Sequence, residues 1–243
     1  MPNHVTNRMT VTGPEEAVQE LFDACFSKEK EKPDPYLMEQ IAAARQAGDE
    51  QRAVNLARQI AEIEARPEFD VFDFNKIIPR PAFIYTSGNL RHGSREQTSG
   101  RNWYDWNIAH WGTKWGAYHA EINERDPGRL VVRFDTAWSP PEPVFQVLAR
   151  WFPELGFNIE YIDEFSNFWG VFTAEADESG ASGGDRLRDE SYGGDRDDSR
   201  AQELRKRLCI ELQGYDPDET DVKEPSGDGP VASGAGVVTA AVS

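Results

Sequence analysis

The side chains best suited to chemistry lie in one short stretch, residues 102–118, which reads NWYDWNIAHWGTKWGAY and holds four of the chain's seven tryptophans. Asp105, His110 and Lys114 are acid–base types, and a catalytic acid or base must lie within hydrogen-bond reach of the proton that it moves. Asp105 and His110 are five residues apart, however, which on a helix places them about 140° apart around the axis. The spacing therefore disfavours a catalytic pair, and we predict no catalytic residue in this stretch.

A structural role explains the tryptophans more simply. Their spacing predicts a short helix over residues 102–111 that ends at Gly112. We expect the indoles to cover the open face of a sheet, each N–H bonded to a carbonyl or an asparagine, and Trp138 to fix a corner between a strand and a helix. The candidate binding or structural residues are Asn75, Lys76, Trp103, Asp105, Trp106, His110, Trp111, Lys114, Trp115 and Trp138.

A binding pocket is the alternative interpretation of the same residues. Trp106, His110 and Lys114 would then hold a small molecule or a nucleotide, since aromatic side chains stack on bases in proteins that bind single strands. Such proteins place their aromatics on exposed strands in a basic surround, whereas these tryptophans fall on a predicted helix in an acidic chain. We therefore favour the structural role.

The sequence contains no metal or cofactor motif. Four histidines and two cysteines show neither HExxH nor CxxC spacing, so we predict no metal site. Gly112-Thr113-Lys114 lacks the GxxxxGKS or GxxxxGKT spacing of a phosphate-binding loop. We also expect no cofactor.

The composition is strongly acidic, because 43 Asp and Glu against 26 Lys and Arg give a formal charge of −17. Such a surface repels phosphate, and binding to nucleic acid normally uses clustered Lys and Arg. Conventional nucleic-acid binding is therefore disfavoured, and a protein with a basic site is the expected partner. There is no run of 18 apolar residues and no apolar segment after a basic start, so we predict a cytoplasmic protein without a membrane partner. The oligomeric state stays open.

Hydrophobic periodicity predicts an α+β fold. Alternating apolar residues indicate strands, and apolar residues at helical spacing indicate helices. The predicted strands cover residues 5–12, 70–74, 117–123, 130–138, 157–162 and 168–173, and the predicted helices cover residues 14–26, 102–111 and 144–151. Without the additions the order is βαββαβ, the ferredoxin-like split βαβ arrangement with an antiparallel sheet.

A charged insertion interrupts this pattern at residues 27–68. Residues 27–35 are typical of a linker, and residues 36–65 predict a hairpin of two helices that turns at Gly48-Asp49. The apolar seam between the two helices is thin, so we expect the hairpin to pack against the main domain or a partner. Residues 85–101 are polar and rich in Gly and Ser, which predicts a loop.

The composition changes sharply at Glu175. From there to the end the chain holds 17 acidic and 8 basic residues, a net charge of −9, which leaves −8 for the preceding part. Gly, Ser, Asp and Arg dominate, so we predict a largely disordered acidic tail. Within it, leucines at helical spacing predict one amphipathic helix over residues 201–213. The expected division is a ferredoxin-like domain over residues 1–174 and a tail over residues 175–243.

Five motifs, taken together, resemble a known family. They are Met1-Pro2-Asn3 with Asn7-Arg8-Met9-Thr10-Val11-Thr12-Gly13, then Phe72-Asp73-Phe74-Asn75-Lys76-Ile77-Ile78-Pro79, Asn102-Trp103-Tyr104-Asp105-Trp106, Trp111-Gly112-Thr113-Lys114-Trp115, and Thr136-Ala137-Trp138-Ser139-Pro140-Pro141. In this order they resemble the ferredoxin-like proteins of unknown function typified by the plasmid protein YubB, which occur mostly on phages, prophages and conjugative plasmids. The resemblance covers residues 1–174 apart from the insertion. It implies a ferredoxin-like fold and a mobile-element context, and no established activity.

The chain departs from that family at two places. Members usually have Trp-Cys where this chain has His4-Val5, and often Cys where it has Asn107. A cysteine-based chemistry in relatives would therefore not carry over to this chain.

These features favour a non-enzymatic accessory protein of a mobile genetic element that acts by protein–protein contact. One specific form is an anti-defence or host-takeover factor whose acidic surface occupies a basic, nucleic-acid-binding site on a host protein. The alternative hypothesis is a small-molecule or nucleotide-binding protein, or a small enzyme, that uses Trp106, His110 and Lys114.

Overall fold

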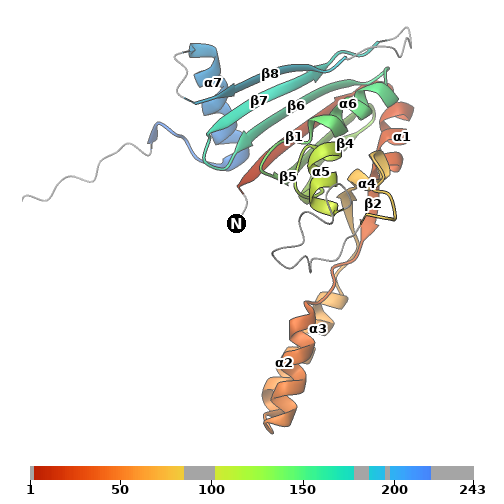
Figure 1. The fold of residues 1–243 in the computed structure, drawn as a ribbon, viewed down its shortest axis with the longest axis vertical. Helices are drawn as coiled ribbons and strands as arrows, with labels where there is room; N and C mark the ends of the chain where they lie inside the picture. Colours follow the sequence, from red (N-terminus) through yellow and green to blue (C-terminus); the bar gives the residue numbers. More distant parts are fainter. Residues whose placement is uncertain (1–2, 85–101, 178–185, 195–197, 220–243) are drawn as a thin grey trace, which may run out of the picture.

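The computed structural model of the chain describes residues 3–84, 102–177, 186–194 and 198–219. Within these residues a six-stranded antiparallel sheet carries helices on both faces, and a helical hairpin projects from the body (Figure 1). None of the described helices is both long and apolar enough to cross a membrane. The predicted loop over residues 85–101 lies outside the described residues.

The sheet and two of its helices form the main unit of the fold. Its elements are β1 (His4–Thr12), α1 (Glu15–Cys25), β4 (Tyr118–Asp126), β5 (Arg129–Ala137), α6 (Glu142–Trp151), β6 (Gly156–Asp163), β7 (Phe168–Ala174) and β8 (Arg188–Gly193). The strand order is β4-β5-β1-β6-β7-β8, and every neighbouring pair is antiparallel. The chain order β1-α1-β4-β5-α6-β6 is the ferredoxin-like βαββαβ arrangement, so the predicted fold class is confirmed.

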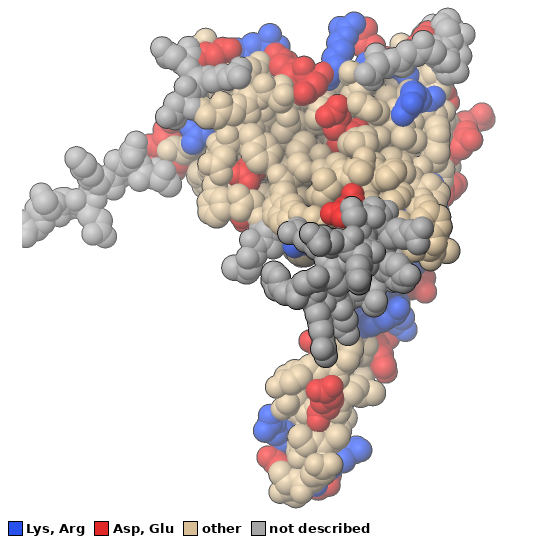
Figure 2. Space-filling model, viewed as in Figure 1, with Lys and Arg blue, Asp and Glu red and all other residues tan. Residues whose placement is uncertain are grey.

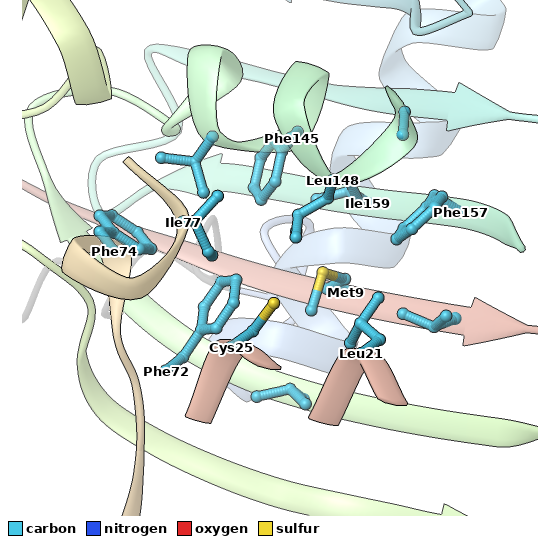
Figure 3. Packing of buried hydrophobic residues seen from close by; sticks show 14 of the residues in the cluster. Met9, Leu21, Cys25, Phe72, Phe74, Ile77, Phe145, Leu148, Phe157 and Ile159 are labelled. Carbon is cyan, nitrogen blue, oxygen red and sulfur yellow. The ribbon is translucent and has the colours of Figure 1, made fainter. Parts of the chain in front are cut away.

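The main core lies between the sheet and the helices α1 and α6 (Figure 3). Alternation along β1 points Met9 into it, and helical spacing on α1 brings Leu21 and Cys25 to the same side. Phe145 and Leu148 enter this core from α6, and all five side chains are fully buried. Cys25 is a packing residue in this core, and burial raises the pKa of its thiol to about 12.

An arm of two helices projects away from the sheet (Figure 1). It consists of α2 (Pro35–Gln46) and α3 (Glu50–Glu64), and a ribbon of β2 (Phe26–Glu29) and β3 (Phe69–Phe72) joins it to the body. The two helices bury a small apolar cluster of their own, which is separate from both buried clusters of the body. The expectation that the hairpin packs against the main domain is therefore wrong, and a partner for it stays a prediction.

The strand β2 corrects the interpretation of residues 27–35 as a linker. Two of its four residues are charged, yet the strand pairs with β3, which follows only after the whole helical hairpin. Lys28 and Asp70 form an ion pair across the two strands at 2.7 Å. The short β2 leaves no local signal in the sequence, because it is defined by its pairing with β3.

Removal of the arm is expected to leave the body folded. In a variant that joins Glu29 to Phe69 by an Asn-Gly turn, we expect the free energy of unfolding to change by less than about 1 kcal/mol, because the body loses no core contact and the closed loop becomes shorter. Urea unfolding followed by far-UV circular dichroism measures this change. A body that no longer folds would show that the arm is part of its core.

The described residues after residue 174 include a strand as well as the predicted helix, and the prediction of a largely disordered tail did not include that strand. β8 extends the sheet beside β7, and α7 (Ser199–Leu208) continues into a π-helical turn (Cys209–Gln213). The helix predicted over residues 201–213 is thus present. With Trp169 of β7 it forms a second buried cluster, on the face of the sheet opposite the main core. Residue 174 therefore does not separate a folded part from a disordered one.

Ion pairs also attach α7 to the sheet. The carboxylate of Glu160 on β6 lies between Arg8 on β1 and Arg207 on α7. Glu211 contacts both of these arginines from the π-helical turn. The hydrogen bond from Arg8 holds the pKa of Glu211 below its usual range. Charges that alternate in sign thus connect β1, β6 and the C-terminal helix.

Candidate functional site

The helix α5 (Trp103–Trp111) carries most of the candidate residues. Asn102 caps its first turn, because its side-chain oxygen accepts from the backbone N–H of Asp105 at 2.8 Å and its amide donates to the Asp105 carboxylate at 2.6 Å. The helix ends at Gly112, whose φ of 76° lies in the left-handed region. A Cβ at this position would lie 2.8 Å from Cδ of Pro143. The predicted helix and its end are both confirmed.

Trp106 and Trp111 face inward from α5 and are buried in the main core. Nε1 of Trp111 donates to the carbonyl of Ile78 at 3.0 Å, and its ring meets Phe74 edge to face at 5.8 Å. The guanidinium of Arg80 lies 4.9 Å from the centroid of the same ring. These two indoles therefore serve packing, as the structural interpretation predicts.

His110 and Asp105 do not form a pair. The His110 ring stacks on Trp106, with 4.3 Å between centroids and 7° between planes. Its Nδ1 lies 2.8 Å from the carbonyl oxygen of Trp106. Asp105 belongs to the cap at the other end of the helix. Neither side chain orients the other, which agrees with the angular separation expected from their spacing.

The side chain of Lys114 lies between two indoles. Its Nζ is 4.8 Å from the centroid of Trp115 and 4.7 Å from that of Trp138. Both rings are partly exposed, at 37% and 39%, and Tyr104 meets Trp138 edge to face at 5.8 Å. The expectation that the four tryptophans of the run cover the sheet is therefore wrong for Trp115, while Trp103 packs partly against the main core.

The corner between β5 and α6 is held by hydrogen bonds from this stretch. Oγ1 of Thr113 donates to the carbonyl of Ala137 at 2.7 Å. Oγ of Ser139 donates to the carbonyl of Gly112 at 2.5 Å. Trp138, which lies between Ala137 and Ser139, adopts a φ of 79°. The corner role predicted for Trp138 and its neighbours agrees with these contacts.

Asn75 and Lys76 belong to a short helix, α4 (Phe74–Ile77), and the side chains of both form hydrogen bonds with backbone groups. Nζ of Lys76 donates to the carbonyls of Asp23 at 3.0 Å and Phe26 at 2.5 Å. These carbonyls lie at the end of α1, so Lys76 caps that helix from outside. Oδ1 of Asn75 accepts a hydrogen bond from the backbone N–H of Arg80 at 3.1 Å. The two residues thus join α4 to its surroundings.

The pocket hypothesis required Trp106, His110 and Lys114 to converge. The structure places the three side chains in two groups, since Trp106 and His110 stack on each other and Lys114 contacts Trp115 and Trp138. No contact between these side chains joins the two groups within the described part of the chain. Across that same part, no three His, Cys, Asp or Glu side chains converge as metal ligands do.

An open groove lies elsewhere, between α1 and the turn that joins β4 to β5. Its volume is about 820 Å³. Apolar side chains form part of its lining, namely Val18, Phe22, Pro127 and Leu130. Carboxylates also line it, namely Glu15, Glu16, Glu20, Asp23 and Asp126, together with one cation, Arg125. Figure 2 shows acidic side chains along the margin of the body where Figure 1 places α1.

The carboxylates of this groove carry unbalanced charge. All five are exposed, and none of them forms an ion pair with another described residue. The guanidinium of Arg125 lies 3.6 Å from the Phe22 centroid and bonds to Gln19 at 3.0 Å. The groove is therefore an acidic surface with an apolar component, suited to a cationic ligand.

Sequence reasoning missed this groove. The spacing of Glu16, Glu20 and Asp23 on one helical face was a usable signal. The opposite wall comes from a turn more than a hundred residues away, however, and no local pattern joins the two walls.

The fold and the groove define a ferredoxin-like α+β protein with an acidic surface. Residues 114–200 match the model of a family described as the ferredoxin-like domain in Api92-like protein. That match runs from before β4 into α7, so it includes β8. The crystal structure of a protein api92 from Yersinia pseudotuberculosis is similar over 81% of this chain and 100% of its own, with 14% sequence identity and a TM-score of 0.47. No curated protein matches the chain.

Proposed function

We propose that this protein is a non-enzymatic accessory protein of a mobile genetic element and acts by binding a basic surface of another protein in the acidic groove. The groove itself is the observation that carries the proposal. It combines an exposed apolar side chain, Pro127, beside the buried side chains of Val18, Phe22 and Leu130 with exposed carboxylates that have no ion-pair partner among the described residues. Protein–protein interfaces use this combination of an apolar centre and a polar rim.

The charge of the chain supports a basic partner. Residues 1–174 carry a formal charge of −8 before the acidic C-terminal part adds to it. Complementary charge across an interface increases the association rate and excludes partners of the same sign. Each exposed carboxylate contributes only about 0–1 kcal/mol, however. Binding therefore depends on several carboxylates acting together and weakens with salt.

The mobile-element part of the proposal rests on the set of five sequence motifs. An anti-defence or host-takeover factor that occupies a nucleic-acid-binding site on a host protein is its most specific form, because such a site is basic. A cytoplasmic location in the host follows from that role. Neighbouring genes test this part: phage or plasmid genes beside this one support it, and a chromosomal metabolic operon contradicts it.

Charge-neutral variants test the groove. We expect a variant with Glu16→Gln and Glu20→Gln to capture its partner from a lysate of the host several-fold less than the unchanged protein does. The matched control carries Glu62→Gln and Glu64→Gln on the arm, which remove the same charge from another exposed helix. Quantitative mass spectrometry of proteins retained at about 50 mM and about 500 mM salt measures the effect, since exposed charges are screened over this range.

The result that contradicts the proposal is equally defined. If no partner is retained in a salt-dependent way, the groove does not recognise a basic protein. The same conclusion follows if the capture of the partner falls equally in both double variants. Far-UV circular dichroism of each variant confirms that the substitutions, all at exposed positions, leave the fold intact.

A further inference from the structure

We infer that the acidic groove selects an arginine side chain of its partner and that Arg125 occupies the arginine position in the unbound protein. The inference rests on the proposed function and names the chemistry of the partner. It starts from a local arrangement among the described residues: Arg125, the one cation that they contribute to the groove, lies on a ring and forms no ion pair with the surrounding carboxylates.

The contacts of Arg125 describe the position that a partner's arginine would take. Its guanidinium carbon lies 3.6 Å from the centroid of Phe22, which is the distance of a flat group lying on a ring. One of its nitrogens donates to the side-chain oxygen of Gln19 at 3.0 Å. Gln19 is in turn held by its amide, which donates to the carboxylate of Asp23 at 2.8 Å.

The position favours a guanidinium over an ammonium ion. A guanidinium is planar and weakly hydrated, so it stacks on an aromatic ring while its edge donates hydrogen bonds, whereas an ammonium is a compact and strongly hydrated charge. The Phe22 ring is 7% exposed with Arg125 over it, and Arg125 itself is exposed. A cation over a ring at such a solvent-accessible position contributes about 0.5–1 kcal/mol, which corresponds to an affinity about two- to fivefold higher. Phe22 supplies the ring, and Gln19 supplies the acceptor at the edge.

Arg125 is placed to be displaced. It is an exposed residue on the edge strand β4, and its described polar contact is the single bond to Gln19. The carboxylates of the groove do not hold it, since Arg125 takes part in no ion pair with any residue that the structure describes. Displacement of Arg125 from Phe22 would therefore break only one hydrogen bond and one ring contact. The partner's arginine that replaces it would bring its own positive charge beside Glu16, Glu20 and Asp23.

Two peptides that differ only in arginine or lysine test the inference. Each is a short, extended, fluorescein-labelled peptide of Gly and Ser with three arginines or three lysines, and fluorescence anisotropy gives its dissociation constant. We expect the arginine peptide to bind the unchanged full-length protein about two- to fivefold more tightly. Arg125→Ala vacates the ring, so we expect this variant to increase the preference for arginine further.

The control separates stacking from charge. Arg129→Ala removes a nearby positive charge from outside the groove lining, where Arg129 pairs with Glu124 at 2.7 Å. It should strengthen both peptides equally and leave the arginine preference unchanged. Equal binding of the two peptides, or an Arg125→Ala effect that is the same for both, overturns the inference while the proposed function stands. Binding of neither peptide, alongside salt-dependent capture of a partner that the groove variants reduce, also overturns it.

Discussion

Replacement of Trp111 by alanine is expected to lower the free energy of unfolding by about 3–5 kcal/mol, a large share of the 5–15 kcal/mol that stabilises a typical domain. The side chain is 3% exposed, so its loss leaves a cavity in the main core. The carbonyl of Ile78 loses its donor, and Phe74 and Arg80 lose the ring that they contact.

The control for this prediction is a tryptophan of similar size on the surface. Trp151 on α6 is 49% exposed, and we expect Trp151→Ala to cost less than about 1 kcal/mol. Urea unfolding followed by far-UV circular dichroism avoids the fluorescence that both substitutions remove. Equal losses for the two variants would contradict the structural role of the tryptophan run.

Replacement of Trp169 by alanine is expected to release the C-terminal helix from the sheet. Trp169 is 1% exposed and belongs to the second buried cluster. Its Nε1 donates to the carbonyl of Ala201 at 2.9 Å, and Arg205 lies 5.8 Å from its ring. Loss of the ring should lower the free energy of unfolding by about 3–5 kcal/mol. Because the ring contacts α7, we expect this helix also to open locally without unfolding of the whole domain.

Hydrogen–deuterium exchange separates local opening from global unfolding. We expect residues 199–213 of Trp169→Ala to exchange much faster, while residues 15–25 of α1 keep their protection. Trp138→Ala is the control, because Trp138 is half-exposed and contacts Lys114 rather than α7. Unchanged protection of residues 199–213 would mean that the ion pairs of Glu160 and Glu211 suffice to hold the helix.

The parts of the fold that sequence predicts are those with a local period. Alternation gave β1, β5 and β6, helical spacing gave α1 and α6, and α5 was defined by its tryptophans and by Gly112. Each of these elements buries one face against the core, so its own residues carry the signal. The amphipathic helix in the C-terminal part was visible for the same reason.

The parts that sequence missed depend on pairing. β8 reads RDESYG and lies at the edge of the sheet, where polar side chains are tolerated on both faces. Only its pairing with β7, which places Tyr192 beside Trp169, makes it a strand. β2 is a second example, because its partner lies beyond the helical hairpin. Composition alone assigned both segments to irregular structure.

The candidate site shows the same division. Residue types indicated correctly that Trp106 and Trp111 serve packing. The contacts of Lys76 with the end of α1 and of Lys114 with two indoles came only from the structure. The groove joins residues 15–23 to residues 125–130 and has no counterpart in any single motif. The surface on which the proposed function depends was therefore not predictable from local pattern.

Hydrogen–deuterium exchange of the complex with the captured partner locates the binding surface on this protein. We expect the partner to slow exchange in residues 15–23 of α1 and in the turn around residues 125–130. The arm should be unchanged, although Tyr36, Met38 and Val54 are exposed there. Protection confined to the arm, or to the surface around Trp115 and Trp138, would contradict the assignment of the acidic groove as the binding site.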